Sequence, residues 1–321
     1  MKTFFAITTA FLLYTTGFAQ TKAKPAPVSA GKVEIIENFK SKFVEKRNVE
    51  VYLPAEYFTN PNQKFPVLYM QDGQNVFNPK TSKLNVAWEA DSTADKLIAE
   101  KRVKPVIIVA VWYNEVLRYS EYFPEKAAAN FTPEDKANVD KLLKQMNMKS
   151  DKLLGDEYLK FLTGELKPYI DKKYRTLTDA PNTAICGSSL GALLSLYAIC
   201  EYPNVFGEAA CVSTHWPVLM DNSNMAPSMA IKKYVWEHLP DPKNHRIYFD
   251  YGTAMLDQYY EVHQKSIDEI MKSKGYTDRK NWVTKKFDKA AHLEKSWQER
   301  FDGILEFLFV NNTTAIAKKK K

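Results

Sequence analysis

The segment AICGSSLGALLSLYAIC, from Ala184 to Cys200, decides the fold of this chain. An apolar run precedes Gly187, and after Ser189 apolar residues recur with helical spacing, at Leu190, Leu193, Leu194 and Tyr197. A buried strand that passes through a tight turn into a helix is the building unit of an α/β sheet. The segment therefore predicts such a unit at the centre of the fold.

Strand-like and helix-like segments alternate along most of the chain. We expect strands at 32–39, 48–54, 65–70, 103–113, 182–187, 207–214, 245–252 and 281–287, and helices at 88–101, 152–174, 190–202, 227–238, 256–274 and 293–310. The first two strands alternate apolar and polar residues, which indicates antiparallel pairing, whereas several later ones are continuously apolar, as in buried parallel strands. The pattern predicts a doubly wound, mostly parallel α/β sheet with helices on both faces.

The N-terminal residues have the pattern of a secretory signal peptide. Lys2 supplies a positive charge, residues 4–14 are apolar, and Gly17 and Ala19 are small residues at the cleavage position. We expect a signal peptide over 1–19, a linker over 20–32, one domain over 33–311 and a basic tail over 312–321. The protein is then periplasmic or secreted. No later stretch reaches the roughly 18 apolar residues of a membrane span.

The net charge of +7 does not indicate a nucleic-acid partner. Eight lysines lie in the predicted signal peptide, linker and tail, and without them residues 33–317 carry a net charge of about −1. Nucleic-acid binding needs a basic face on the folded domain itself, so we expect none. The absence of a GxGxxG or P-loop motif likewise gives nucleotide binding no support.

The three cysteines, Cys186, Cys200 and Cys211, all lie in apolar segments. An odd count without metal-ligand spacing predicts neither a disulfide framework nor a zinc site. We expect buried thiols, although export leaves a bond between Cys186 and Cys211 open.

Residues 122–151 interrupt the alternation with a long polar excursion that contains an amphipathic helix near 133–146. In α/β enzymes such a segment often covers the active site as a lid. A plain surface insertion explains the sequence equally well, and both interpretations stay open here.

The turn after the central strand matches G-x-S-x-G, with Ser189 between Gly187 and Gly191. The motif alone is a weak signal, but it requires a strand directly before it and a helix directly after it, and the sequence predicts both. In that geometry the serine hydroxyl projects from the sheet, and the Leu190 N–H at the helix start can stabilise an oxyanion. We therefore predict Ser189 as a nucleophile.

A serine nucleophile needs a base, and in this type of fold the chain order is serine, acid, histidine. Of the five histidines only His292 lies in a loop between the last predicted strand and the last helix, where it reaches the carboxyl edge of the sheet. The acid is expected in the loop after strand 245–252, which favours Asp257 over Glu261. Asp250 lies within that strand and suits a structural role.

A second oxyanion donor is expected after strand 65–70. The residues Asp72, Gly73 and Gln74 follow this apolar run, and the backbone N–H of Gly73 or Gln74 lies at the required end of the strand. An Asp-Gly pair also forms ordinary turns, so the prediction rests on the position in the sheet.

Taken together, these segments resemble the esterase branch of the α/β-hydrolases, which includes enterochelin esterases, esterase D and related carbohydrate esterases. The resemblance covers most of residues 33–310 and rests on RNVEVYLPAEY (47–57), FPVLYMQDGQNVF (65–77), AWEAD (87–91), RYSEYFP (118–124), YLKFLTGELKPYIDKKY (158–174), CGSSLGAL (186–193) and HLEKSWQERF (292–301). It implies an α/β-hydrolase fold and an ester hydrolase that uses serine, histidine and an acid, with no metal and no cofactor.

Two positions depart from the pattern of that family. Ala192 stands where a second glycine is frequent, and Met255 stands where some relatives carry a carboxylate. Some relatives work with little contribution from the acid, so a dyad of Ser189 and His292 stays open beside the triad with Asp257.

The expected partner is a small-molecule or glycan ester, and feruloylated or acetylated glycans, siderophore esters and small acyl esters all suit the sequence. Acyl transfer at the same site and ligand binding without catalysis are the alternatives. Residues near the predicted carboxyl edge that suit a substrate pocket are Trp88, Arg118, Tyr122, His215 and Trp216. Core packing explains the two tryptophans equally well.

Overall fold

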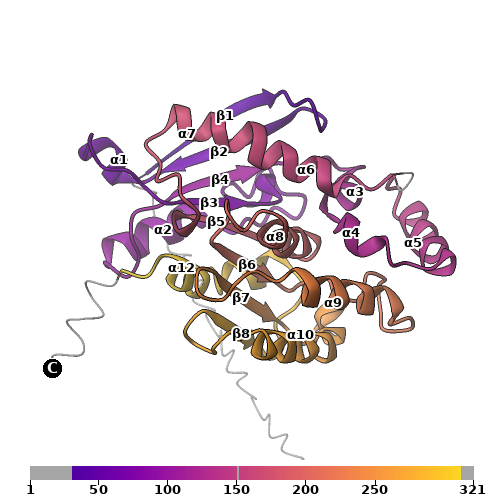
Figure 1. Ribbon diagram of the computed structural model, residues 1–321. Coiled ribbons are helices and arrows are strands. Elements are labelled where there is room, and N and C mark those ends of the chain that lie inside the picture. The colour runs from indigo at the N-terminus through magenta and orange to yellow at the C-terminus, as the bar shows by residue number, and fades with distance from the viewer. Residues whose placement is uncertain (1–30, 150–151, 312–321) are drawn as a thin grey trace, which may run out of the picture.

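The computed structural model describes residues 31–149 and 152–311, which contain an eight-stranded sheet (Figure 1). The strand order is β1-β2-β4-β3-β5-β6-β7-β8. The strands are β1 Lys32–Phe39, β2 Arg47–Leu53, β3 Val67–Met70, β4 Ile107–Val111, β5 Thr183–Ser188, β6 Glu208–Val212, β7 Arg246–Tyr251 and β8 Trp282–Lys286. β2 pairs antiparallel with β1 and β4, and the pairs from β4 to β8 are parallel.

Helices cover both faces of this sheet (Figure 1). On one face lie α6 Gly155–Phe161, α7 Lys167–Lys173, α8 Leu190–Glu201, α9 Ala226–His238 and α10 Glu261–Ser273, and on the other lie α2 Ala90–Ala99 and α12 Phe301–Phe309. Shorter elements are α1 Ala55–Thr59, η1 Gly73–Asn75, α3 Arg118–Tyr122, α4 Glu125–Ala128, α5 Pro133–Gln145, η2 Leu162–Leu166, η3 Ala180–Asn182, η4 Met255–Tyr259 and α11 Glu294–Gln298. This arrangement confirms the predicted α/β-hydrolase fold.

Successive residues of the central strands enter two separate cores. Val67 and Tyr69 of β3 pack on the side of α8, whereas Leu68 and Met70 pack on the side of α2 and α12. Because side chains alternate across a strand, a strand covered on both faces needs apolar residues at every position. The continuous apolar runs in the sequence therefore arise because helices cover both faces of these strands.

Three of the predicted helices are broken into shorter pieces. The segment 152–174 folds as α6, the π-helical turn η2 and α7, and Pro168, which has no N–H to continue the ladder, follows the π-helical turn. The segment 256–274 comprises η4 and α10, and Arg300 separates α11 from α12. The predicted signal peptide, nearly all of the predicted linker and the basic tail lie outside the described residues.

The domain begins with β1 at Lys32, one residue before its predicted start. Cys186, Cys200 and Cys211 are buried and free, so the open alternative of a bond between Cys186 and Cys211 is wrong. None of the helices in residues 31–149 and 152–311 is long and apolar enough to cross a membrane.

The polar excursion forms α4 and α5, close to the predicted helix 133–146. A capping box between Thr132 and Asp135 starts α5, and Asp135 also accepts a hydrogen bond of 2.9 Å from Asn224 in the loop after β6. A cavity of about 410 Å³ lies beneath α5, and its lining includes Tyr119, Phe123, Phe131, Val139 and Leu143. The function of this segment as a lid stays a prediction.

Candidate active site

Ser189 lies in the turn between β5 and α8, at the carboxyl edge of the sheet. Its backbone has φ 57° and ψ −119°, in a region that residues other than glycine rarely adopt. A Cβ atom at Gly187 would lie 2.5 Å from the backbone carbonyl carbon of Gly191, so the turn requires glycine there. The G-x-S-x-G spacing thus allows a strained turn that presents a partly exposed serine.

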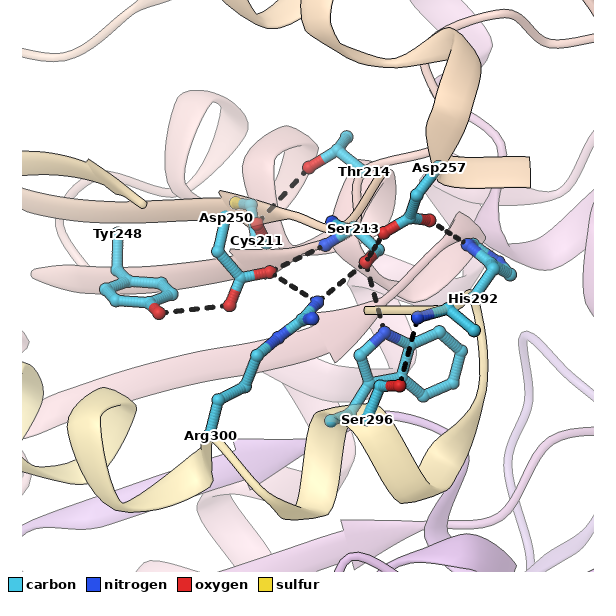
Figure 2. Close-up of polar contacts among 12 residues, drawn as sticks. Cys211, Ser213, Thr214, Tyr248, Asp250, Asp257, His292, Ser296 and Arg300 are labelled. Carbon is cyan, nitrogen blue, oxygen red and sulfur yellow. Dashed lines mark hydrogen bonds and ion pairs between the residues drawn. The ribbon is translucent and has the colours of Figure 1, made fainter. Parts of the chain in front are cut away.

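Three side chains from three separate loops form a hydrogen-bonded chain. Nε2 of His292 lies 3.0 Å from Oγ of Ser189, and Nδ1 of His292 lies 2.5 Å from Oδ1 of Asp257. Figure 2 shows the side chains of His292 and Asp257 pointing toward each other. Because a carboxylate only accepts, Nδ1 carries the hydrogen and Nε2 is left to accept the serine proton. An arrangement of this kind can activate a serine hydroxyl.

Asp257 is buried, and its second oxygen also has two hydrogen-bond donors. Oδ2 accepts from the backbone N–H of Gly252 and from the hydroxyl of Ser213, each at 2.6 Å. Burial acts to raise the pKa of Asp257, but the hydrogen bonds from His292, Ser213 and Gly252 and the nearby imidazole outweigh it and lower the pKa. The acid beside His292 is therefore held in its ionised form.

Glu261, the alternative acid, lies one turn further along the chain at the start of α10. Its carboxylate pairs with Lys265 at 2.8 Å and with Lys286 at 2.9 Å. Among the predicted acids, the structure brings Asp257 and not Glu261 to His292.

Backbone hydrogen bonds tie the loop of His292 to the loop that precedes Asp257. The N–H groups of Thr253 and Ala254 both donate to the carbonyl of Ala290 at 3.0 Å. The imidazole of His292 also forms edge-to-face contacts with the rings of Tyr260 and Trp297, with centroids 5.7 and 5.1 Å away. The base is thus fixed relative to the acid by main chain and aromatic packing together.

The three predicted oxyanion donors lie at helix starts. Leu190 is the first residue of α8, and Gly73 and Gln74 open the 3₁₀ turn η1. The first N–H groups of a helix have no acceptor within it, so they are available to a ligand. A Cβ atom at Gly73 would lie 2.7 Å from the backbone of Ala110, which makes glycine necessary there. The roles of these N–H groups stay predictions.

Arg118 and Tyr122 hold the loop before η1. The guanidinium of Arg118 donates to both oxygens of Asp72 at 2.6 and 2.9 Å and lies over the rings of Tyr113 and Tyr122. The hydroxyl of Tyr122 accepts from the backbone N–H of Asp72 at 3.2 Å. Tyr122 is fully buried, whereas 18% of the Arg118 side chain is exposed, so only Arg118 is accessible to a ligand.

His215 lies behind the serine rather than in a pocket wall. Its Nδ1 is 3.0 Å from the hydroxyl of Tyr260, and its Nε2 is 3.3 Å from the carbonyl oxygen of Val218. Burial, with a further effect from His292, lowers the pKa of His215 to about 3. A neutral, buried His215 therefore packs beneath the site instead of lining it, contrary to the expectation from sequence.

Trp88 and Trp216 belong to the core, which corrects their predicted place in a substrate pocket. Trp88 is 3% exposed, and its ring packs against Trp297 and Phe301. Trp216 is 1% exposed, and its indole N–H donates to the side chain of Gln264 at 3.0 Å. Burial removes both rings from contact with a ligand, in line with the usual behaviour of aromatic side chains.

Four further residues surround the site and were not predicted from the sequence: Ser213, Tyr260, Glu294 and Arg300. The side chain of Glu294 accepts a 3.3 Å hydrogen bond from Asn75, and burial raises its pKa. Glu294 and Arg300 both lie in the segment HLEKSWQERF, and Ser213 directly follows β6. Position after a strand was the available signal for Ser213. In the described part of the chain, no group of three or more His, Cys, Asp or Glu side chains forms a potential metal site.

The mostly parallel sheet, the strained serine turn and the order of the loops define an α/β-hydrolase. Residues 41–308 match the family described as "Putative esterase", and the chain belongs to this family. The resemblance inferred from the sequence is thereby confirmed.

Individual proteins show the same relationship at low identity. The chain is 23% identical over 278 residues to the uncharacterized protein YbbA of Bacillus subtilis (strain 168), covering 84% of this chain and 95% of that protein. A ferulic acid esterase structure has a TM-score of 0.62 at 22% identity, with 87% of this chain and 98% of that chain covered. The enterobactin esterase FES of Shigella flexneri has a TM-score of 0.61 at 15% identity, with 88% and 60% covered. At these identities the two structures support the fold.

Proposed function

We propose that this protein is an exported serine esterase that hydrolyses carboxylic esters through Ser189, His292 and Asp257. The observation that carries the proposal is the chain of hydrogen bonds from Ser189 through His292 to Asp257, at 3.0 and 2.5 Å. The strained turn at Ser189 supports it, since strain of this kind gathers at functional sites.

In the proposed reaction, Oγ of Ser189 attacks the ester carbonyl while Nε2 of His292 takes its proton. Backbone N–H groups of Leu190 and of Gly73 or Gln74 stabilise the tetrahedral oxyanion. The imidazolium, stabilised by Asp257, then protonates the departing alcohol and leaves an acyl-enzyme. A water molecule deprotonated by His292 hydrolyses this intermediate and releases the acid.

The proposed substrates are glycan esters of aromatic acids or siderophore esters. Similar structures are named ferulic acid esterase and enterobactin esterase, which supports an ester with an aromatic acyl group. Export, which we propose from the pattern of residues 1–19, fits substrates outside the cytoplasm. Mass spectrometry of the mature protein should then find an N-terminus at Gln20.

Fluorophosphonate labelling and ester hydrolysis test the proposal together. The wild type should take up one label and hydrolyse members of a panel of feruloyl, acetyl and siderophore esters, whereas Ser189→Ala should do neither. Equal labelling of both proteins contradicts the proposal. Product analysis with added alcohols or sugars separates hydrolysis from acyl transfer, because transfer yields a new ester in place of the free acid.

A further inference from the structure

Ser213 occupies a costly backbone conformation at the end of β6. It is fully buried, and its φ of 44° lies in the left-handed region. Its N–H donates to the carbonyl oxygen of Asp250 at 3.0 Å and lies 3.1 Å from Oδ1 of the same residue. A strained residue persists when its surroundings hold it, and such residues cluster at functional sites.

Arg300, which contacts Ser213, is also buried in a way that reduces the stability of the fold. Its Nη2 donates to Oδ1 of Asp250 at 2.8 Å and to Oγ of Ser213 at 2.7 Å, and 3% of its side chain is exposed. Within the described residues, its Nε and Nη1 atoms have no hydrogen-bond partner. Buried ion pairs are weak sources of stability and unpaired buried donors reduce it, so stability alone does not explain this arrangement.

The hydrogen bonds at Ser213 Oγ determine where its own proton points (Figure 2). Nε1 of Trp297 at 3.1 Å and Nη2 of Arg300 at 2.7 Å both lie within bonding distance of this oxygen. Indole and guanidinium nitrogens only donate, so they occupy the lone pairs of the hydroxyl. The single hydroxyl hydrogen is left for Oδ2 of Asp257, 2.6 Å away.

We propose that Ser213, held by Arg300 and Asp250, is a positioning residue that orients the carboxylate of Asp257 toward His292. The donors Ser213 and Gly252 occupy Oδ2 of Asp257, which leaves Oδ1 for the imidazole. The strained backbone of Ser213 and the buried, incompletely paired Arg300 both reduce stability. In this proposal they are retained because together they hold the carboxylate of Asp257 in place. This inference rests on the proposed function, because it assigns Ser213 a role through Asp257.

Ser213→Gly is the direct test, because glycine adopts a positive φ without strain and the substitution removes only the hydroxymethyl group. We expect kcat to fall on the order of 10-fold to 100-fold with KM nearly unchanged, as for other residues that orient a group in contact with the reaction. Thr214→Val is the matched control. Thr214 is the buried neighbour, its hydroxyl donates to the carbonyl of Cys211 at 3.3 Å, and its loss should leave kcat within about 2-fold.

A double-mutant cycle with Asp257→Ala separates positioning from a structural effect. If Ser213 acts through Asp257, Ser213→Gly should slow the wild type but add almost nothing to Asp257→Ala, measured with an activated aryl ester. An equal loss in both backgrounds, or no loss in the wild type, overturns the inference. Ser189→Ala is measured in parallel, since activity retained in that variant contradicts the proposed function itself rather than the role of Ser213.

Discussion

The two ends of the parallel strands hold their polar residues in different ways. At the carboxyl ends of β3, β5 and β6, the residues Asp72, Ser189 and Ser213 have φ values of 57°, 57° and 44°. At the amino ends of β6 and β7, Glu208 and Arg246 form a 3.0 Å ion pair within regular strands. Strained backbone is thus found where the loops present the candidate site, as expected for the ligand-binding edge of an α/β sheet.

The pKa of a buried carboxylate also shifts in opposite directions at the two ends of the strands. Burial raises the pKa of Glu208 to about 7, although Arg246 opposes the shift. Burial of Asp257 is outweighed by its three hydrogen-bond donors and the nearby imidazole, and its pKa is lowered. The comparison teaches that the number of donors aimed at a carboxylate, rather than its burial, decides whether it stays ionised.

The largest difference is expected between two histidines at opposite ends of the sheet. His292→Ala should lower kcat/KM by about 10⁴-fold or more, because it removes the base that contacts Ser189. His245→Ala is the control, since within the described residues its ring nitrogens hydrogen-bond with the carbonyl oxygens of Asp241 and Pro203, near the start of β7. Steady-state hydrolysis of an aryl ester measures both, and similar losses in the two variants contradict the assignment of the site.

The next effect concerns the acid. Asp257→Asn should lower kcat by about 10²-fold to 10⁴-fold, because an amide neither fixes the imidazole tautomer nor stabilises the imidazolium. Glu261→Gln should change kcat less than about 2-fold, since Glu261 pairs with surface lysines. Full activity of Asp257→Asn would indicate that Ser189 and His292 work as a dyad.

Substitution of Glu208, at the amino end of β6, should change the stability of the protein rather than its activity. The folded pKa of Glu208 is about 7 against an ordinary value of 4.5, so between these pH values the folded state binds more protons and the free energy of unfolding falls as pH rises. The loss is at most about 3 kcal/mol and is complete above pH ~7. Urea unfolding at pH 5 and pH 8 should show a weaker pH dependence for Glu208→Gln than for the wild type, with unchanged kcat. An equal dependence in both proteins refutes the raised pKa.

The smallest effect is expected in the polar excursion at residues 122–151, away from both ends of the parallel strands. Thr132→Ala removes the cap of α5 and should lower the free energy of unfolding by about 1 kcal/mol, measured by urea titration. Among the described residues its hydroxyl hydrogen-bonds with Asp135 of the same helix, so kcat should be retained. A fall in kcat would favour the lid interpretation over the surface insertion.

Ser189 and His292 could be assigned from the sequence because each depends on local order along the chain. A G-x-S-x-G turn between a strand and a helix is contained in a dozen residues, and His292 follows from its place after the last strand. The choice between Asp257 and Glu261 could not be made in this way. Both follow the same strand, and only the path of η4 into α10 turns one toward His292 and the other toward lysines.

The sequence by itself determined the alternation of strands and helices, the serine turn and the order of the loops, because hydrophobic period and turn chemistry are properties of neighbouring residues. Tertiary structure decided which distant side chains meet. The sequence could not show whether Trp88 lines a pocket or packs in the core, and its contact with Phe301 of α12 places it in the core. The hydrogen bonds from Arg300 through Ser213 to Asp257 join three segments that lie far apart in the chain. Such contacts depend on the packing of whole elements, which no short window of sequence contains.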